Sequence, residues 1–222
     1  MPDILGHNYI AGGQIASELT SSVLLGCGQF CTSPGLVIGI RSREFTAFLE
    51  SFAALMNEQS AQTMLNAGTL KSYSKGLELL QEEVFGPTTV VVEVADKTEL
   101  LRALHGLHGL HGQLTATLIA EAADLDGCAD LLALLEQKAG RVLLNGYPTG
   151  VEVCDSMVHG GPYPATSDAR GTSVGTPAID RFLRPVCYQN CPDALLPDAL
   201  KNANPLGLQR LVDGAETRAA LG

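Results

Sequence analysis

Two cysteines lie four positions apart in residues 26–35, "GCGQFCTSPG", directly after a helix-like stretch. The spacing of Cys27 and Cys31 allows a metal site, a disulfide, a pair of packed apolar thiols, or one reactive thiolate presented by a tight loop. A thiolate is a strong nucleophile when main-chain N–H groups or positive charge stabilise it, and the same N–H groups can bind an oxyanion. From these residues alone, the structural and the catalytic interpretation of Cys31 both stay open.

A second cysteine pair, Cys187 and Cys191 in "CYQNC", has the same spacing. With Cys27 and Cys31 it would make four thiolates, but zinc ribbons favour tighter knuckles with two residues between the thiols. We therefore expect no metal. Cys128 and Cys154 are expected to behave as small apolar residues.

The repeat "LHGLHGLHG" at 104–112 is the other metal candidate. Its histidines, His105, His108 and His111, are spaced by three and interleaved with glycines that weaken a helix, and no acidic residue lies close by. The repeat is predicted to lengthen a helix-to-strand connection.

Residues 80–87, "LQEEVFGP", form a second candidate binding segment, because paired acids and an aromatic residue precede a strand pattern. The alternative is the C-terminus of a helix followed by a turn.

These segments need a scaffold, and the hydrophobic periodicity supplies one. Predicted helices cover 9–25, 43–57 (capped by Ser42), 97–107 and 125–138, and predicted strands cover 36–40, 88–94, 114–120 and 140–145. The alternation predicts an α/β fold, a mainly parallel sheet with helices on both faces, plus a C-terminal extended strand and tail.

The organisation changes after residue 145, where a Gly- and Pro-rich stretch, 146–177, predicts a long ordered loop region. Residues 181–190 suggest an extended edge segment. We predict a nucleophile-bearing domain over 1–180 and an oligomerisation-type strand with a tail over 181–222.

The charge and hydropathy of the chain limit the classes of partner that it can have. The formal net charge is -10 and the basic residues do not cluster, which argues against nucleic acid. The N-terminus does not have the pattern of a signal peptide, and no apolar run approaches the length of a membrane span. We expect a cytoplasmic protein.

Taken together, the ordered motifs "GQFCTSPG", "EEVFGP", "GRVLLNGYPTGVEV" and "HGGPYPATSDARGTSVGT" resemble the C-terminal catalytic portion of the aldehyde dehydrogenase superfamily. The last two motifs and "AIDRFLRPVCYQN" are most similar to the branch that oxidises 2-oxoglutarate semialdehyde (2,5-dioxopentanoate). The resemblance extends over essentially the whole chain.

The resemblance implies roles for individual residues. Cys31 would be the nucleophile, forming a thiohemiacetal and then a thioester, and its main-chain N–H would contribute to the oxyanion site. NAD or NADP would be the cofactor, with Glu83 at the nicotinamide-side ribose and Phe85 near the nicotinamide ring. Phe30 and the loop containing Pro148 and Thr149 would line the approach of a small aldehyde.

The resemblance also implies that parts of the active site are missing from this chain. In the family, the matching region is preceded by the dinucleotide-binding domain, the general-base glutamate and the oxyanion-site asparagine. We therefore expect a truncated chain that does not complete NAD-linked turnover alone, and a homo-oligomer in the full-length parent. The alternative is a non-catalytic subunit or fragment that pairs with a full-length homologue.

Overall fold

The computed structural model describes residues 9–79, 84–105, 110–150 and 152–221. The chain divides into two compact units, Met1–Arg181 and Phe182–Gly222. The first unit holds the predicted α/β elements, and the second holds the tail. Glu83 and His108, which the sequence singled out, lie outside the described residues.

The first unit contains five α-helices and four strands among its described residues. The helices are α1 (Tyr9–Leu24), α2 (Arg43–Asn57), α3 (Ala67–Leu79), α4 (Lys97–Leu104) and α5 (Ala129–Lys138). The strands are β1 (Leu36–Ile40), β2 (Val90–Val94), β3 (Gln113–Leu118) and β4 (Ala139–Leu144), with short 3-10 turns at η1 (Leu25–Gly28), η2 (Ala122–Gly127) and η3 (Thr176–Phe182).

The strands form two parallel pairs, which confirms the predicted strand direction. β1 pairs with β2 in the register Leu36↔Val90, and β3 pairs with β4 in the register Gln113↔Ala139. No ladder joins β1 to β3 in the described part of the chain, so the pairs remain separate two-stranded sheets.

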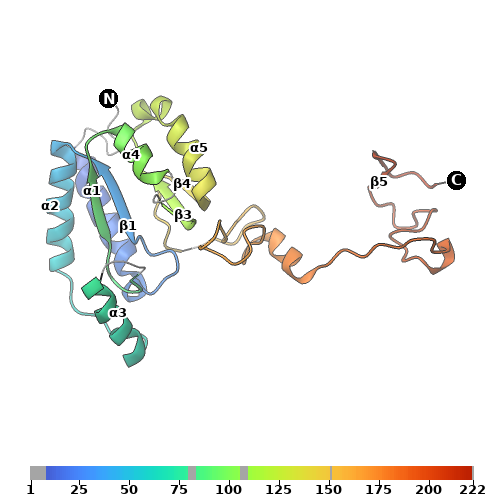
Figure 1. Ribbon diagram of the computed structural model, residues 1–222, viewed down its shortest axis with the longest axis horizontal. Coiled ribbons are helices and arrows are strands. Elements are labelled where there is room, and N and C mark those ends of the chain that lie inside the picture. Colours follow the sequence, from blue (N-terminus) through green and yellow to red (C-terminus); the bar gives the residue numbers. More distant parts are fainter. Residues whose placement is uncertain (1–8, 80–83, 106–109, 151, 222) are drawn as a thin grey trace. The chain divides into compact units, whose positions relative to one another are not determined.

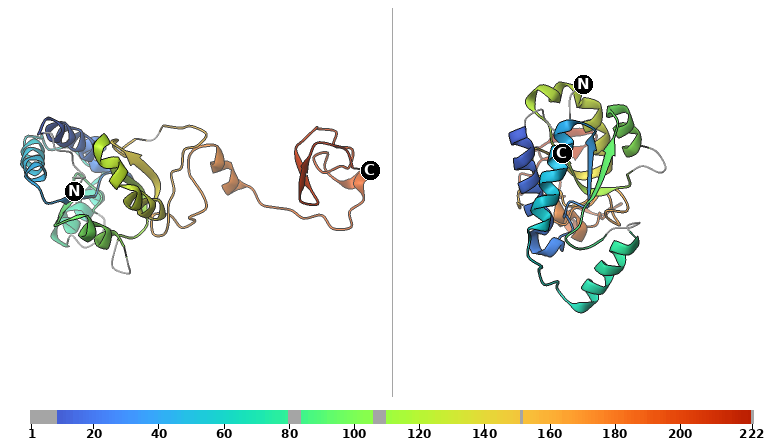
Figure 2. Two further views of the ribbon diagram at one scale, coloured as in Figure 1. Left: turned by 90° about the horizontal axis from the view of Figure 1, so that it is seen from above. Right: turned by 90° about the vertical axis from the view of Figure 1, so that its left-hand side faces the viewer.

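Helices cover both faces of these strands, as predicted. One buried cluster joins α1 and α2 to Val37 and Val91, while a second joins α4 and α5 to Ile38 and Val142. Neighbouring residues of β1 therefore point to opposite faces, the alternation expected of a strand covered on both sides. Figures 1 and 2 show α1 and α2 together on one side of the β1–β2 pair and α4 and α5 on the other.

Helix α2 forms where the sequence placed it, because its cap and its apolar face agree. The Ser42 hydroxyl accepts a hydrogen bond from the N–H of Phe45 at 3.0 Å, satisfying one of the unpaired donors at the start of the helix. Phe45, Phe48 and Phe52 are buried and stacked along one side. Helix α3 lies in a stretch for which no regular element was predicted.

The second unit contains the turn η4 (Asp193–Leu195) and an antiparallel hairpin of β5 (Arg210–Val212) and β6 (Ala215–Thr217). Asp213 and Gly214 connect the two strands, both with positive φ. No hairpin was predicted in the tail, so the β5–β6 pair is a difference. No helix in the described part of the chain has the length and apolarity required to cross a bilayer.

Candidate active site

The cysteine loop reverses the chain through three successive left-handed residues. Gly26, Cys27 and Gly28 have φ values of 58°, 59° and 64°, a conformation that costs glycine little and other residues more. The turn buries Cys27 and leaves Cys31 exposed beyond it. The two cysteines therefore occupy different environments, one packed and one accessible.

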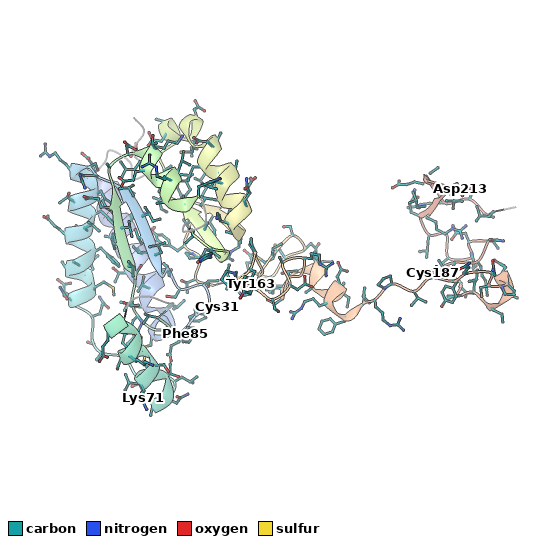
Figure 3. All side chains as sticks on the ribbon, viewed as in Figure 1. Cys31, Lys71, Phe85, Tyr163, Cys187 and Asp213 are labelled. Atoms are coloured by element: carbon teal, nitrogen blue, oxygen red, sulfur yellow. The ribbon has the colours of Figure 1, made fainter. Side chains whose placement is uncertain are left out.

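Gly28 allows this loop to touch the segment that carries Phe85. A Cβ at position 28 would collide with the main chain of Gly86 and Pro87, so only glycine permits the approach. Phe30 and Phe85 are 41% and 44% exposed, and both border the same cavity as Cys31. Figure 3 places Cys31 and Phe85 at the same end of the first unit.

The thiol of Cys31 has a partner that the sequence analysis did not identify. Its Sγ lies 3.3 Å from Nε2 of His159, which is 128 positions away in the chain. The main chain of His159 is fixed on both sides: its N–H donates to the Thr172 hydroxyl at 2.8 Å, and its carbonyl accepts from the Ser173 N–H at 3.0 Å. Because Thr172 is buried, the main chain that carries the imidazole is held in a defined position.

A guanidinium lies near the same thiol. Arg141, on β4, donates from Nη2 to the carbonyl of Pro148 at 2.5 Å and from Nη1 to the carbonyl of Gly150 at 3.3 Å. Burial lowers the pKa of Arg141, and the charge on Cys31 acts in the opposite direction. Arg141 thus braces the 146–150 loop and brings positive charge within electrostatic reach of the sulfur.

The loop residues expected near the aldehyde differ in their surroundings. Pro148 is buried and borders the cavity that also contains Cys31. The Thr149 hydroxyl instead lies 2.5 Å from the Ser22 hydroxyl and donates to the Ser22 carbonyl at 3.1 Å, which ties the loop to α1. Tyr147 donates from its hydroxyl to the carbonyl of Ile15 at 3.1 Å, a further tie to the same helix.

These residues gather at the amino ends of the strands. Cys31 precedes β1, and Phe85 precedes β2. A Cβ at Gly112 or Gly140, at the starts of β3 and β4, would collide with the main chain of residues 160–163, just after His159. Open α/β sheets more often bind ligands at the carboxyl ends of their strands, so this site is built at the opposite edge.

The remaining thiols are not alike. Cys128 is buried, its sulfur donates to the Asp124 carbonyl at 3.2 Å, and burial raises the pKa of its thiol. Cys154 was expected to be a small apolar residue but is exposed, because it lies in the loop region rather than in a strand. Within the described residues, no group of three His, Cys, Asp or Glu side chains could hold a metal ion.

Comparisons with known proteins show which sequences and folds the chain is similar to. The chain is 47% identical to an alpha-ketoglutaric semialdehyde dehydrogenase of Acinetobacter baylyi over 98% of its length and 48% of the relative. It is 43% identical to alpha-ketoglutaric semialdehyde dehydrogenase 2 of Azospirillum brasilense over 91% of its length and 46% of the relative. The chain thus spans about half the length of the curated relatives it matches. No family model matches it.

Solved structures show the same fold at low sequence identity. A gamma-glutamyl-gamma-aminobutyraldehyde dehydrogenase of Burkholderia cenocepacia superimposes with a TM-score of 0.62 and 17% identity, over 77% of this chain and 41% of that one. The NAD+ complex of an aldehyde dehydrogenase of Bacillus cereus superimposes with a TM-score of 0.59 and 15% identity, over 75% and 40%.

Proposed function

The chain belongs to the aldehyde dehydrogenase superfamily, and from that premise we propose that it is the nucleophile-bearing part of an NAD(P)-dependent enzyme that oxidises an aldehyde to an acid. The observation that carries this proposal is the contact between the exposed Cys31 thiol and the His159 imidazole. Without a basic or cationic neighbour, a thiol near neutral pH is mostly protonated and a weak nucleophile.

The residues around Cys31 suit formation of a thiohemiacetal. His159 accepts the thiol proton, and the sulfur then bonds to the aldehyde carbon while the carbonyl oxygen takes on negative charge. The main-chain N–H of Cys31 is proposed to stabilise that oxygen. The Arg141 guanidinium lies within electrostatic reach of the sulfur and braces the loop beside it.

The site also suits a nicotinamide cofactor on one side. Phe85 presents a half-exposed ring beside the Cys31 loop, a flat apolar surface against which a nicotinamide could rest. Glu83 is proposed to bind the adjacent ribose. NAD or NADP, when bound, would supply the acceptor for the hydride lost from the substrate carbon.

We propose 2-oxoglutarate semialdehyde as the substrate, because both curated relatives carry that activity in their names. Phe30 and Pro148 border the cavity at Cys31 and are proposed to contact the aldehyde. Thr149 is proposed to position the loop that contacts the aldehyde, since its hydroxyl is hydrogen-bonded to Ser22 of α1.

Three further proposals concern the chain's context. We expect the 222-residue chain alone to produce no sustained NADH or NADPH, because among the described residues the hydrogen bonds of Cys31 involve no carboxylate that could activate water. We place the protein in the cytoplasm, and we propose domain boundaries at 1–180 and 181–222.

A homo-oligomer is also proposed, in the full-length parent. In residues 183–189 no regular element forms, and the apolar side chains of Leu183, Val186 and Tyr188 are exposed. Such a segment is suited to pair with a strand of another subunit. The same observation favours the second candidate function, a non-catalytic subunit that pairs with a full-length homologue.

Protection from alkylation tests the proposed substrate on this chain directly. The folded protein is treated with iodoacetamide, and each cysteine is quantified by peptide mass spectrometry. We expect 2-oxoglutarate semialdehyde to slow alkylation of Cys31 and to leave Cys154 unchanged, whereas hexanal, which has no carboxylate, protects much less. Equal protection of both thiols, or none at Cys31, would overturn the proposal.

A further inference from the structure

The edges of β1 and β3 that are not paired border one cavity. Its volume is about 800 Å³, and it extends from the cysteine loop along both strands. β1 pairs only with β2 and β3 only with β4 in the described part of the chain. Two parallel pairs with free edges on a common cavity have the arrangement of a sheet from which one strand is missing.

The hydrogen bonds show which main-chain groups face this cavity. The Gly35 carbonyl accepts from Val90, and the Arg41 N–H donates to Val94, so the odd-numbered positions of β1 face β2. Successive residues of a strand direct their main-chain groups to alternate edges. The N–H and carbonyl groups of Leu36, Ile38 and Ile40 therefore point to the opposite edge, and Leu36 and Ile38 line the cavity there.

The hydrogen bonds of β3 show its unpaired edge in the same way. The Leu118 carbonyl accepts from the N–H of Asn145, so the even-numbered positions of β3 face β4. The main-chain groups of Thr115 and Thr117 consequently point away from β4. The buried hydroxyls of Ser33 and Thr117, both on the cavity wall, have no hydrogen-bond partner.

Apolar helices close the cavity above and below. Leu19 of α1 and Phe48 of α2 line one face, and Leu104 of α4 and Leu131 of α5 line the other. A segment lying between these layers would have both of its side-chain faces buried. Strands covered on both faces are near-continuous runs of Val, Ile and Leu, so the occupant should be aliphatic.

The two free edges set the length of the occupant. β1 has five residues and β3 has six, and both line the cavity of about 800 Å³. A segment that pairs along β1 and β3 therefore needs about five residues. A small ligand would leave most main-chain groups of both edges unpaired.

We propose that this cavity binds one extended aliphatic segment as a parallel strand between β1 and β3, completing the order β2-β1-segment-β3-β4. The source to which we commit is the half of the matched relatives that this chain does not span, since the chain covers 48% and 46% of their lengths. The inference rests on the free edges and the cavity, and it does not depend on the activity proposed for Cys31.

Amide hydrogen exchange, followed residue by residue by NMR, tests the proposal. The 222-residue chain is measured alone and mixed with the half of the Acinetobacter baylyi relative that it does not match. We expect the amides of Ile38, Thr115 and Thr117 to exchange at least about tenfold more slowly in the mixture. The amides of Val91 and Glu93, which face the outer edge of β2, are the internal control and should not change.

A second experiment, with two peptides, distinguishes binding as a paired strand from other apolar binding. A soluble peptide with a five-residue Val/Ile run is expected to protect the same three amides, and a version with proline at alternate positions of the run is not. Protection by both peptides would indicate apolar binding without pairing and would overturn the proposal. Protection that needs no partner and rises with chain concentration would assign the cavity to a second copy of the chain. Protection by the partner only after deletion of residues 1–8 would assign the cavity of the intact chain to those residues. Either result would overturn the proposal.

Discussion

Replacing His159 with Asn should slow the reaction of Cys31 with iodoacetamide about threefold at pH 7. The side chains of His159 and Cys31 approach to 3.3 Å. At that separation an imidazolium–thiolate pair gains about 1.3 kcal/mol in water and about 5 kcal/mol at an effective dielectric constant of about 20. Because Cys31 is exposed, the lower figure applies, and it corresponds to about a tenfold change in the population of the ion pair.

Not all of that gain appears in the rate, because a stabilised thiolate is also a weaker nucleophile. With a Brønsted coefficient of about 0.4 to 0.5, the tenfold gain in population is offset by a loss of about threefold in intrinsic reactivity. The net factor of about threefold should vanish near pH 10, where thiols ionise without help.

The assay is site-resolved alkylation across pH, with Cys154 as an exposed reference thiol in the same molecule. His105→Asn is the matched control, since it removes an exposed imidazole at the end of α4. If His159→Asn and His105→Asn gave the same Cys31 rate at pH 7, or if the His159→Asn deficit persisted unchanged at pH 10, the assigned role of the imidazole would be wrong.

Three further predictions concern the framework of the site. Burial, then the nearby charge of Glu18, raises the pKa of Tyr147 above its ordinary value of 10.0, so the stabilising effect of the Tyr147 hydroxyl is present below pH 10 and is lost as the pH rises further. In thermal melts, Tyr147→Phe should be less stable than the wild type at pH 7 by about 1 kcal/mol but should lose less stability above pH 10. An identical loss of stability above pH 10 in both proteins would contradict this. Gly28→Ala should cost at least about 1 kcal/mol, since a left-handed residue gains a Cβ that meets Gly86; chemical denaturation measures it, with Gly13→Ala, where a Cβ would meet nothing within 4 Å, as the control. Ser42→Ala should cost about 1 kcal/mol by removing the α2 cap, and Ser42→Asp should restore most of it; a neutral Ser42→Ala would show that the cap contributes nothing.

The sequence predicted the scaffold well wherever local signals agreed. In α2 the Ser42 cap and the phenylalanine spacing pointed to the same element, and the apolar run of β1 was found with its observed bounds. Helix α3 was missed because its residues are mostly polar or glycine, so it has few apolar positions to mark a buried face. The β5–β6 hairpin carries an Asp-Gly turn, a recognisable signal that was overlooked.

The site was only partly predictable. Cys31, Phe30 and Phe85 were identified from local motifs and the family resemblance, and all three border one cavity. The partnership with His159 has no local signature, because 128 positions separate the two residues and the contact exists only after the chain has folded. The motif that begins at His159 was noted as part of the family resemblance, but its distance from the cysteine loop in the sequence gave no sign of the contact with Cys31.

The nucleophilic role of Cys31 is tested most directly by the reaction of the purified chain with p-nitrophenyl acetate, which requires no cofactor. Attack by the thiolate transfers the acetyl group to sulfur and releases p-nitrophenolate, which is read by its absorbance. We predict a rapid burst of about one equivalent per chain that is retained in Cys154→Ser and lost in Cys31→Ser. A burst that survives Cys31→Ser, or a wild-type chain without one, would contradict the assignment.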